Sequence, residues 1–386
     1  MTSKPAAVLV GAIGKLPYAG VAAYYLHYVR GLQELGYEVH YVEQQNKSGE
    51  YYDPATRAMT DDLRPAFAYL ASLSGQFGAA PDSVTLLDLA GAAHGLTRAE
   101  LARVVADADV ALTVADATWF DELRACSRRA FVDGDPMFTQ AALAAGEPLM
   151  TTTVENNPTL FSYGTRIGRP GCTIPVCGRQ WIPTRPVVAT ALWPVNASPP
   201  GAPVTALLHW SAGGEVVVDG VAYGHKDVEM PRFLELPARS SRALVLAVGG
   251  RGAPRAELEA AGWQLADPLA STCDAAAYRS FIGGSHADLG IAKHAYVASQ
   301  SGWFSDRATC FLASGRPVLH QDTGFTDWLP AGDGVFVFSS ADDVIDDLER
   351  LDVDYDRHAR AARRIAQEHF EAWRVIGCML DDAAFR

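Results

Sequence analysis

The first fifty residues alternate between short apolar runs and one amphipathic stretch. Residues 6–10 are continuously apolar and lead into a loop, residues 11–14, that contains two glycines. Residues 18–35 place apolar side chains at helical spacing and end at Gly36, after which residues 39–42 form a second apolar run. A buried strand, a glycine loop, an amphipathic helix and a second strand make a βαβ unit. The pattern therefore predicts an α/β fold.

Three further apolar runs in the first half predict strands that end in polar residues. The runs cover residues 110–114, 130–132 and 150–154, and the polar residues after them are Asp116, residues 133–135 and residues 155–157. In an open parallel sheet, ligands bind at the carboxyl ends of the strands, so we expect a binding edge here. Around these runs, the patterns predict helices in residues 51–108, a loop in residues 158–186 and a closing strand in residues 187–193.

A linker rich in proline and small residues, residues 195–203, separates the two halves of the chain. The second half starts again with a strand at residues 205–210 and continues with a hairpin, further strands and helices in the same alternation. The predicted hairpin covers residues 216–223 with an Asp-Gly turn, the other strands cover residues 244–248, 263–266, 317–320 and 335–338, and the last helices cover residues 340–351 and 355–379. We expect two Rossmann-like domains, residues 1–196 and 203–368, and a C-terminal helix, residues 369–386.

Composition narrows the class of protein. The chain has 386 residues, 49% of them hydrophobic, which suits two globular domains. The net charge of −13 argues against nucleic acid as the main partner, because binding to a phosphate backbone needs a basic surface. The sequence has no run long enough to span a membrane and no signal-peptide pattern, and its six scattered cysteines fit reduced thiols, so we expect a cytoplasmic protein. Cys172 and Cys177 lack a second pair of ligands, and no metal site is predicted.

Residues 293–325 carry the strongest chemical signal. A loop of small residues leads into a helical run that starts near Ser305 and ends at Gly315, and a strand follows at once. The free N–H groups at a helix start suit a phosphate oxygen. Arg307 stands in the first turn, where the helix dipole disfavours a cation unless an anion lies in front of it. The alternative is an ordinary helix-to-strand crossover whose arginine faces water.

This segment resembles the donor-binding segment of glycosyltransferases with the GT-B fold. The matching residues are Ser314-Gly315-Arg316-Pro317-Val318, followed by Gln321-Asp322-Thr323-Gly324. The resemblance implies two Rossmann-like domains that face a cleft, with a C-terminal helix that crosses back to the first domain. It further implies transfer of a sugar from a nucleoside-diphosphate sugar to an acceptor, by a Leloir-type enzyme that needs neither metal nor cofactor. Small molecules and natural-product scaffolds are the favoured acceptors, and a glycan and a modified nucleobase stay among those that the sequence allows.

The resemblance also implies roles for individual residues. On the donor side, the diphosphate would contact Lys226, Lys293, Ser301, Gly302, Ser305 and Arg307. On the acceptor side, the loop after the first strand would contribute Gly14, Lys15 and Tyr18, although a plain strand-to-helix turn is the alternative. An inverting transferase needs a base for the acceptor's proton, and Asp135 is favoured over Asp116 because Asp-Pro holds its carboxylate at the strand edge. Either aspartate can also be a simple loop or cap residue.

Two departures from the family pattern point to a divergent subfamily. The glutamate that retaining members carry five residues before the glycine is Cys310 here, and the earlier acidic position is Gly302. A neutral thiol cannot replace a carboxylate that accepts two ribose hydroxyl groups, so the retaining mechanism is not transferred. A nucleotide-sugar epimerase or hydrolase of the same fold, and a nucleotide-sugar-binding module without turnover, are the alternative functions.

Overall fold

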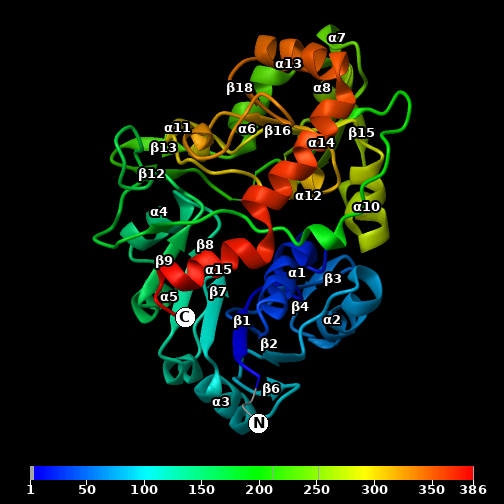
Figure 1. Cartoon of the computed structure of the whole chain (residues 1–386). Helices are drawn as coiled ribbons and strands as arrows, with labels where there is room; N and C mark the ends of the chain where they lie inside the picture. Colours follow the sequence, from blue (N-terminus) through cyan, green and yellow to red (C-terminus); the bar gives the residue numbers. More distant parts are fainter. Residues whose placement is uncertain (1–3, 212, 251, 386) are drawn as a thin grey trace.

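The computed structural model describes residues 4–211, 213–250 and 252–385, and these fold into two halves, each built on a mainly parallel sheet (Figure 1). In the first half, β1 is central, and the only antiparallel pair among the described strands of this sheet is β5 with β6. Its strands, in spatial order, are β10 (Ile182–Pro183), β9 (Thr159–Ser162), β8 (Arg129–Asp133), β7 (Val110–Val114), β1 (Ala6–Val10), β2 (Glu38–Gln44), β5 (Ser83–Leu87) and β6 (Ala93–His94).

The sheet of the second half is parallel at every pairing of its described strands. Its spatial order is β15 (Gln264–Ala266), β14 (Leu244–Gly249), β11 (Val204–His209), β16 (Ala287–Gly290), β17 (Val318–Gln321) and β18 (Val335–Phe338). In each sheet the strands that follow the central strand in the chain are first added on one side of it, and later strands are added on its other side. This is the Rossmann order, with its switch point between β1 and β7 and between β11 and β16.

Helices connect the strands of both sheets, and two small hairpins lie outside them. The first half contains α1 (Ala19–Glu34), α2 (Arg64–Phe77), α3 (Arg98–Asp107), η1 (Asp121–Ala125), α4 (Phe138–Ala144), α5 (Pro148–Asn156), and the hairpin of β3 (Tyr51–Asp53) and β4 (Ala58–Thr60). The second half contains α6 (Lys226–Glu229), η3 (Met230–Phe233), α7 (Leu236–Arg239), α8 (Arg255–Ala260), α9 (Pro268–Thr272), α10 (Ala275–Gly283), α11 (His294–Ala298), α12 (Asp306–Ala313), η4 (Phe325–Asp327), α13 (Ala341–Val353), and the hairpin of β12 (Val216–Val218) and β13 (Val221–Tyr223).

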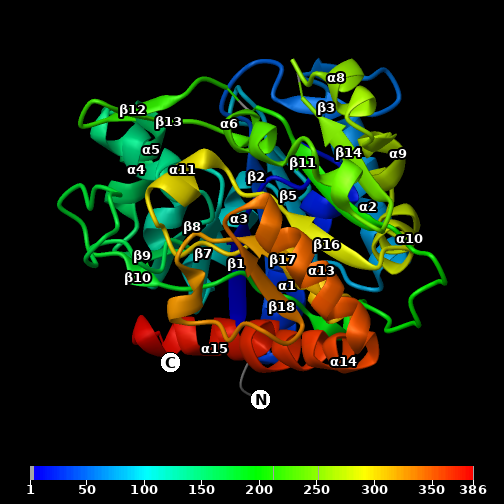
Figure 2. The same ribbon diagram turned by 90° about the horizontal axis from the view of Figure 1, so that it is seen from above.

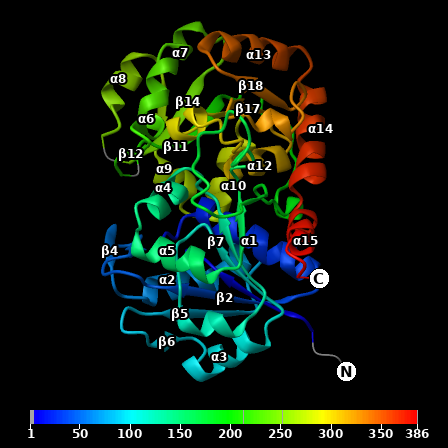
Figure 3. The same cartoon turned by 90° about the vertical axis from the view of Figure 1, so that its left-hand side faces the viewer.

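The C-terminal helices return from the second half to the first, as predicted. α14 (Tyr355–Ile365), the π-helical turn η5 (Ala366–Phe370) and α15 (Ala372–Asp382) run end to end along one side of the molecule (Figures 2 and 3). Gly31 of α1 lies so close to α15 that an added Cβ would meet Ile376 and Ala372 within 2.8 Å. A glycine at this position lets the two helices pack closely, and this contact ties the end of the chain to the first half.

The predicted fold, two Rossmann-like halves that face a cleft, is confirmed, while four local predictions are wrong. Residues 51–108, predicted as helical, also contain the strands β3, β4, β5 and β6. Residues 150–154 lie in α5 and not in a strand, because Pro148 starts the helix and Glu147 accepts a hydrogen bond from the Met150 N–H at 2.6 Å. Residues 187–193 form only a single bridge to Glu371 and a short 3-10 turn, η2 (Thr190–Leu192). The last long strand of the first sheet, β9, lies instead within the segment predicted as a loop.

Candidate active site

A cavity of about 970 Å³ opens between the carboxyl ends of the two sheets. Its walls come from the loops after β1, β7 and β8 in the first half and after β11, β14 and β16 in the second. These loops flank the switch point of each sheet, which is where ligands bind in open α/β folds. The topology therefore places one large cavity where both halves contribute side chains.

Charge is divided unequally between the two walls of this cavity. Every lysine and arginine among the described lining residues comes from the second half: Lys226, Arg255, Lys293 and Arg307. The described lining residues of the first half include one charged side chain, Asp135, together with several tyrosines. The second half therefore offers a site for an anion, and the first half offers an aromatic surface with one carboxylate.

Lys226 is the cation most available to a ligand. It begins α6, and its ammonium group has no hydrogen bond or ion pair within the described part of the chain. Burial, together with the neighbouring Arg307, lowers the pKa of Lys226 to about 7, although Asp288 acts in the opposite direction. An anion in the cavity would provide the negatively charged partner that this ammonium group lacks.

Arg307 is held in place by the second sheet. Its guanidinium donates to both carboxylate oxygens of Asp288, at 3.3 and 3.2 Å, and to the Leu207 carbonyl at 2.6 Å. Asp288 is fully buried in β16, so Arg307 bridges the two strands at the switch point. Since a guanidinium has five N–H groups, these three bonds leave two for a ligand in the cavity.

The start of α12 has the predicted cap and an additional acid. The Ser305 hydroxyl accepts a hydrogen bond from the Ala308 N–H, and the Ser305 N–H donates to Nε2 of His320 at 3.3 Å. Burial lowers the pKa of His320 to about 3, so its imidazole is neutral and can accept this bond. Asp306 also lines the cavity, and burial raises the pKa of its carboxyl group. A diphosphate at this helix start would therefore have an acidic neighbour.

Asp135 and Lys293, which the sequence assigned to separate roles, form one ion pair across the cleft. Lys293 Nζ lies 2.8 and 2.7 Å from the two carboxylate oxygens of Asp135, and the Tyr296 hydroxyl donates to the same carboxylate. Asp135 follows β8 in the first half, and Lys293 caps α11 in the second. In the free protein, Lys293 thus neutralises Asp135, the favoured base, and is not available to an anion.

The loop of small residues lies outside the cavity. The Ser301 carbonyl accepts a hydrogen bond from the Arg166 N–H at 3.1 Å, and the Gly302 carbonyl accepts one from the Thr165 hydroxyl at 3.1 Å. Gly302 has a φ of +76°, and an added Cβ would collide with the Thr165 hydroxyl. The structure therefore places Ser301 and Gly302 in a junction between the halves, away from the predicted diphosphate position.

Of the predicted acceptor loop, only Tyr18 lines the cavity. The Gly14 N–H donates to the buried carboxylate of Glu43 at 2.6 Å. Lys15 is buried and pairs with Asp116 at 2.6 Å and with Glu50 at 3.2 Å. Gly14, Lys15 and Asp116 therefore form a cluster that supports the wall without lining it, which favours Asp135 over Asp116 as the residue that meets a substrate.

Several lining residues were missed by the sequence analysis. They are aromatic or imidazole side chains from both halves: Tyr24, Tyr25, Tyr52, Tyr163, His225 and Trp303. The repeated Tyr-Tyr pairs at residues 24–25 and 51–52 were the available signal. Alone, they read as core residues, because only the fold shows that Tyr24, Tyr25 and Tyr52 line the cavity while Tyr51 is buried away from it.

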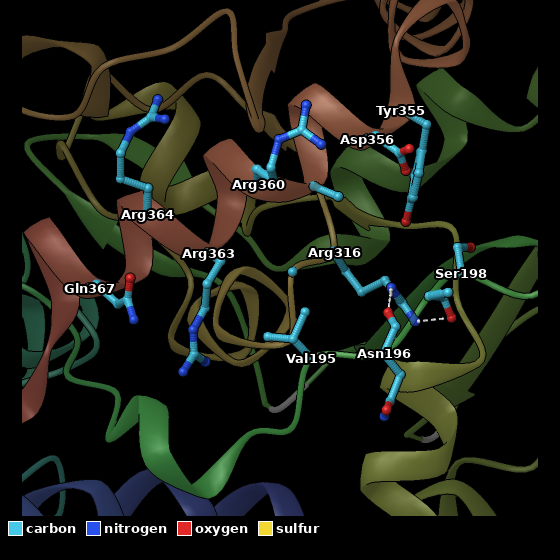
Figure 4. A pocket seen from close by; sticks show the side chains of 13 residues that line it. Val195, Asn196, Ser198, Arg316, Tyr355, Asp356, Arg360, Arg363, Arg364 and Gln367 are labelled. Carbon is cyan, nitrogen blue, oxygen red and sulfur yellow. Dashed lines mark hydrogen bonds between the residues drawn. The ribbon is translucent and has the colours of Figure 1, made fainter.

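A second cavity, of about 470 Å³, lies between the linker and α14 (Figure 4). Arg316, on its floor, donates to the carbonyls of Asn196 and Ala197 at 2.9 and 3.2 Å. Arg363, from α14, donates to the carbonyls of Thr190 and Trp193 at 3.0 and 3.2 Å and points away from Arg316 in this view. Arg316 therefore holds the linker and Arg363 holds the residues just before it, and their guanidinium groups do not converge on a common ligand position.

The sequence matches no protein-family model and none of the curated proteins. Solved structures do resemble the chain over nearly its whole length. An alpha-glucosyltransferase (AGT) in complex with UDP has a TM-score of 0.58 at 12% identity, covering 99% of this chain and 100% of that one. HepE from Anabaena in complex with UDP-glucose has a TM-score of 0.58 at 10% identity, covering 98% and 99%. The sucrose-phosphate synthase from Thermosynechococcus elongatus has a TM-score of 0.52 at 12% identity, covering 99% and 98%.

These neighbours are glycosyltransferases of the GT-B type, and the likeness shows that this chain has the same fold. The low identities agree with a divergent subfamily. Helices of the length and apolar character that a bilayer crossing requires do not occur among the described residues. Nor do those residues contain a group of three or more histidine, cysteine or acidic side chains placed to hold a metal ion.

Proposed function

We propose that this chain, which has the GT-B fold, is a Leloir-type glycosyltransferase: it moves a sugar from a nucleoside-diphosphate sugar to a small-molecule acceptor. The division of charge in the cleft carries the proposal. The second half supplies all the described lining cations, including the unpaired ammonium of Lys226, whereas the first half supplies tyrosines and Asp135. A donor with two phosphates matches the second wall, and an acceptor with a hydroxyl group matches the first.

The donor diphosphate binds Lys226 and the two free N–H groups of Arg307 in this proposal. The nucleoside extends along the loops after β14 and β15, where Gly250 and Asp267 line the cavity. UDP is the first nucleotide to test, because AGT and HepE were both solved with UDP or UDP-glucose. The proposed site thus combines cations at the switch point with a glycine loop that allows close approach.

Transfer forms a bond between the acceptor oxygen and the anomeric carbon, while the bond from that carbon to the diphosphate breaks. The acceptor's proton goes to Asp135, the one carboxylate on the described first wall. Lys226 and Arg307 stabilise the negative charge that develops on the leaving diphosphate. Lys293 pairs with Asp135 in the free protein, and exchange of this partner for a phosphate oxygen of the donor would free the carboxylate to accept the proton.

Thermal shift against UDP, GDP, dTDP, ADP and CMP tests the donor site. A ligand that binds only the folded chain adds about 2.7 kcal/mol of stability at a concentration of 100 Kd. We expect a clear rise in Tm with one of the diphosphates, UDP before the others, and less with CMP. No rise with any nucleotide would contradict the proposal. Mass spectrometry then separates transfer from hydrolysis and epimerisation, because only transfer yields a product that contains the acceptor.

The binding of UDP is expected to weaken as the pH rises above 7. The pKa of Lys226 is lowered to about 7 in the free protein, and an adjacent diphosphate raises it, so binding takes up a proton above that pH. The limiting effect is about a tenfold rise in Kd per pH unit between pH 7 and 9. Calorimetry in buffers of different ionisation enthalpy measures both the affinity and the proton uptake. A Kd that is constant over this range would show that Lys226 does not bind the diphosphate.

A further inference from the structure

The first-half wall of the cleft is aromatic and apolar from its inner end to its mouth. Tyr24 and Tyr163 lie inside, and Tyr18 and Tyr52 form a ring pair nearer the mouth, with centroids 5.4 Å apart. Leu16 and Met59 also line the cavity, although 43% and 52% of their surfaces are exposed, respectively. Large apolar side chains exposed together beside a binding cavity indicate an apolar ligand.

The hydroxyl groups of these tyrosines are already bonded within the protein. Tyr24 donates to Tyr163 at 3.1 Å, and Tyr163 also shares a hydrogen bond of 2.8 Å with Tyr28. Burial, together with a hydrogen bond to Tyr52, raises the pKa of Tyr18 to about 12, so this phenol is neutral. The wall therefore presents ring surface and few free polar groups. A free sugar would leave several hydroxyl groups without partners on such a surface.

The described residues of this wall include no lysine or arginine that lines the cavity. The lysine of the loop after β1, Lys15, is buried and neutralised by Asp116 and Glu50. Residues 50–64, which form the mouth through the β3–β4 hairpin, carry four acidic and two basic side chains. A nucleic acid or a phosphorylated sugar would need cations for its phosphates. The AGT neighbours include complexes with DNA, and the wall described here lacks the charge for such an acceptor.

We propose that the acceptor is an uncharged, planar aromatic alcohol or phenol, which binds the wall formed by Leu16, Tyr18, Tyr52 and Met59 with its hydroxyl group at Asp135. The proposal rests on the proposed glycosyltransferase function and adds the chemical class of the acceptor. The acceptor ring packs against the pair of Tyr18 and Tyr52, and offset or edge contacts between such rings contribute beyond their buried area. Specificity then comes from shape and apolar contact on one wall, and from charge on the other.

The test uses 2-naphthol as the acceptor probe, with UDP-glucose as donor in the full-length chain. We expect 2-naphthol to bind in the presence of UDP, measured by calorimetry, and to yield a glycosylated product detected by mass spectrometry. A DNA duplex and glucose 6-phosphate serve as comparison acceptors and should yield none. If UDP binds but 2-naphthol does not, or if only a phosphorylated acceptor reacts, the aromatic-acceptor proposal is overturned. Failure of every nucleotide to bind would instead overturn the proposed function.

Matched variants locate the subsite. Tyr52→Ser removes the ring and should raise the Kd of 2-naphthol by about tenfold or more, whereas Tyr52→Phe keeps the ring and should change it little. Met59→Glu adds a charge at an exposed position without disturbing the core, and it should likewise raise the Kd of 2-naphthol. All three should leave the Kd of UDP unchanged. Val217→Ser, at an exposed position on β12 outside the cavity, is the control. Unchanged 2-naphthol affinity in both Tyr52→Ser and Met59→Glu would overturn the placement.

Discussion

Replacement of Lys226 by methionine is expected to weaken the binding of UDP by about 1.5–3 kcal/mol, the range for loss of a hydrogen bond to a charged group. The same substitution should stabilise the free protein. The ammonium group of Lys226 has no partner among the described residues, and burial lowers its pKa. The charged form of Lys226 therefore destabilises the folded state. Methionine has a similar length without the charge, so it removes the cost of placing an unpaired ammonium in the cavity wall. Titration with UDP and thermal unfolding without ligand measure the two effects.

The opposite signs of these effects separate a binding role from a structural one. For Lys226, the folded pKa lies below the value of 10.5 for the unfolded chain, so the destabilisation is complete below pH 7 and fades as the pH rises toward 10.5. The advantage of Lys226→Met in stability should therefore be largest near or below pH 7. Arg307→Ala is a poorer test, because it leaves the buried carboxylate of Asp288 without its partner. Lower stability with normal UDP affinity in Lys226→Met would contradict the donor site.

Replacement of Asp135 by asparagine is expected to reduce kcat by about 10²–10⁴-fold, the usual contribution of a general base. Asparagine keeps the shape of the side chain but cannot accept the acceptor's proton at neutral pH. The Kd of UDP should stay the same or fall slightly, since Lys293 loses its carboxylate partner and becomes available to the diphosphate. Steady-state kinetics with saturating donor and acceptor, together with calorimetry for UDP, measure both quantities.

Asp116→Asn is the matched control for this prediction. Asp116 also follows a strand of the first sheet and also pairs with a lysine, Lys15, at 2.6 Å, but it does not line the described cavity. Turnover in Asp116→Asn should therefore stay within a few-fold of the unsubstituted chain. The reverse result, with full activity in Asp135→Asn and a large loss in Asp116→Asn, would assign the proton to Asp116.

Local sequence signals predicted the fold well where periodicity and turn residues agree. The first βαβ unit, the strand of residues 335–338 and the hairpin at Asp219-Gly220 all occur at or near the predicted positions. Residues 150–154 misled the prediction because threonine and valine favour strands, whereas Glu147 and Pro148 start a helix. The strand predicted at residues 187–193 reduces to one bridge, between Val188 and Glu371.

The site was harder to predict than the fold, because pairing partners come from distant segments. The sequence selected Asp135 and Lys293 for separate tasks, and only the closure of the two halves makes them one ion pair. The resemblance assigned Ser301 and Gly302 to the diphosphate, but in the structure they bond to the Thr165 hydroxyl and the Arg166 N–H. The sequence predicted that Arg307 binds an anion. In the structure, part of its guanidinium group already binds a buried carboxylate, that of Asp288.

The sequence by itself determined the alternation of strands and helices in both halves, most of the individual elements, and which types of side chain stand at most of the strand ends. These properties follow from spacing and turn chemistry over a few residues. The tertiary structure alone decided which of those side chains meet a ligand. Lys226 stays unpaired, whereas carboxylates neutralise Lys15 and Lys293. Two of these carboxylates, Asp116 and Asp135, are more than a hundred residues from their lysines along the chain. The charge and the burial of a side chain depend on which groups lie near it in space, and the order of residues along the chain does not show which groups those are.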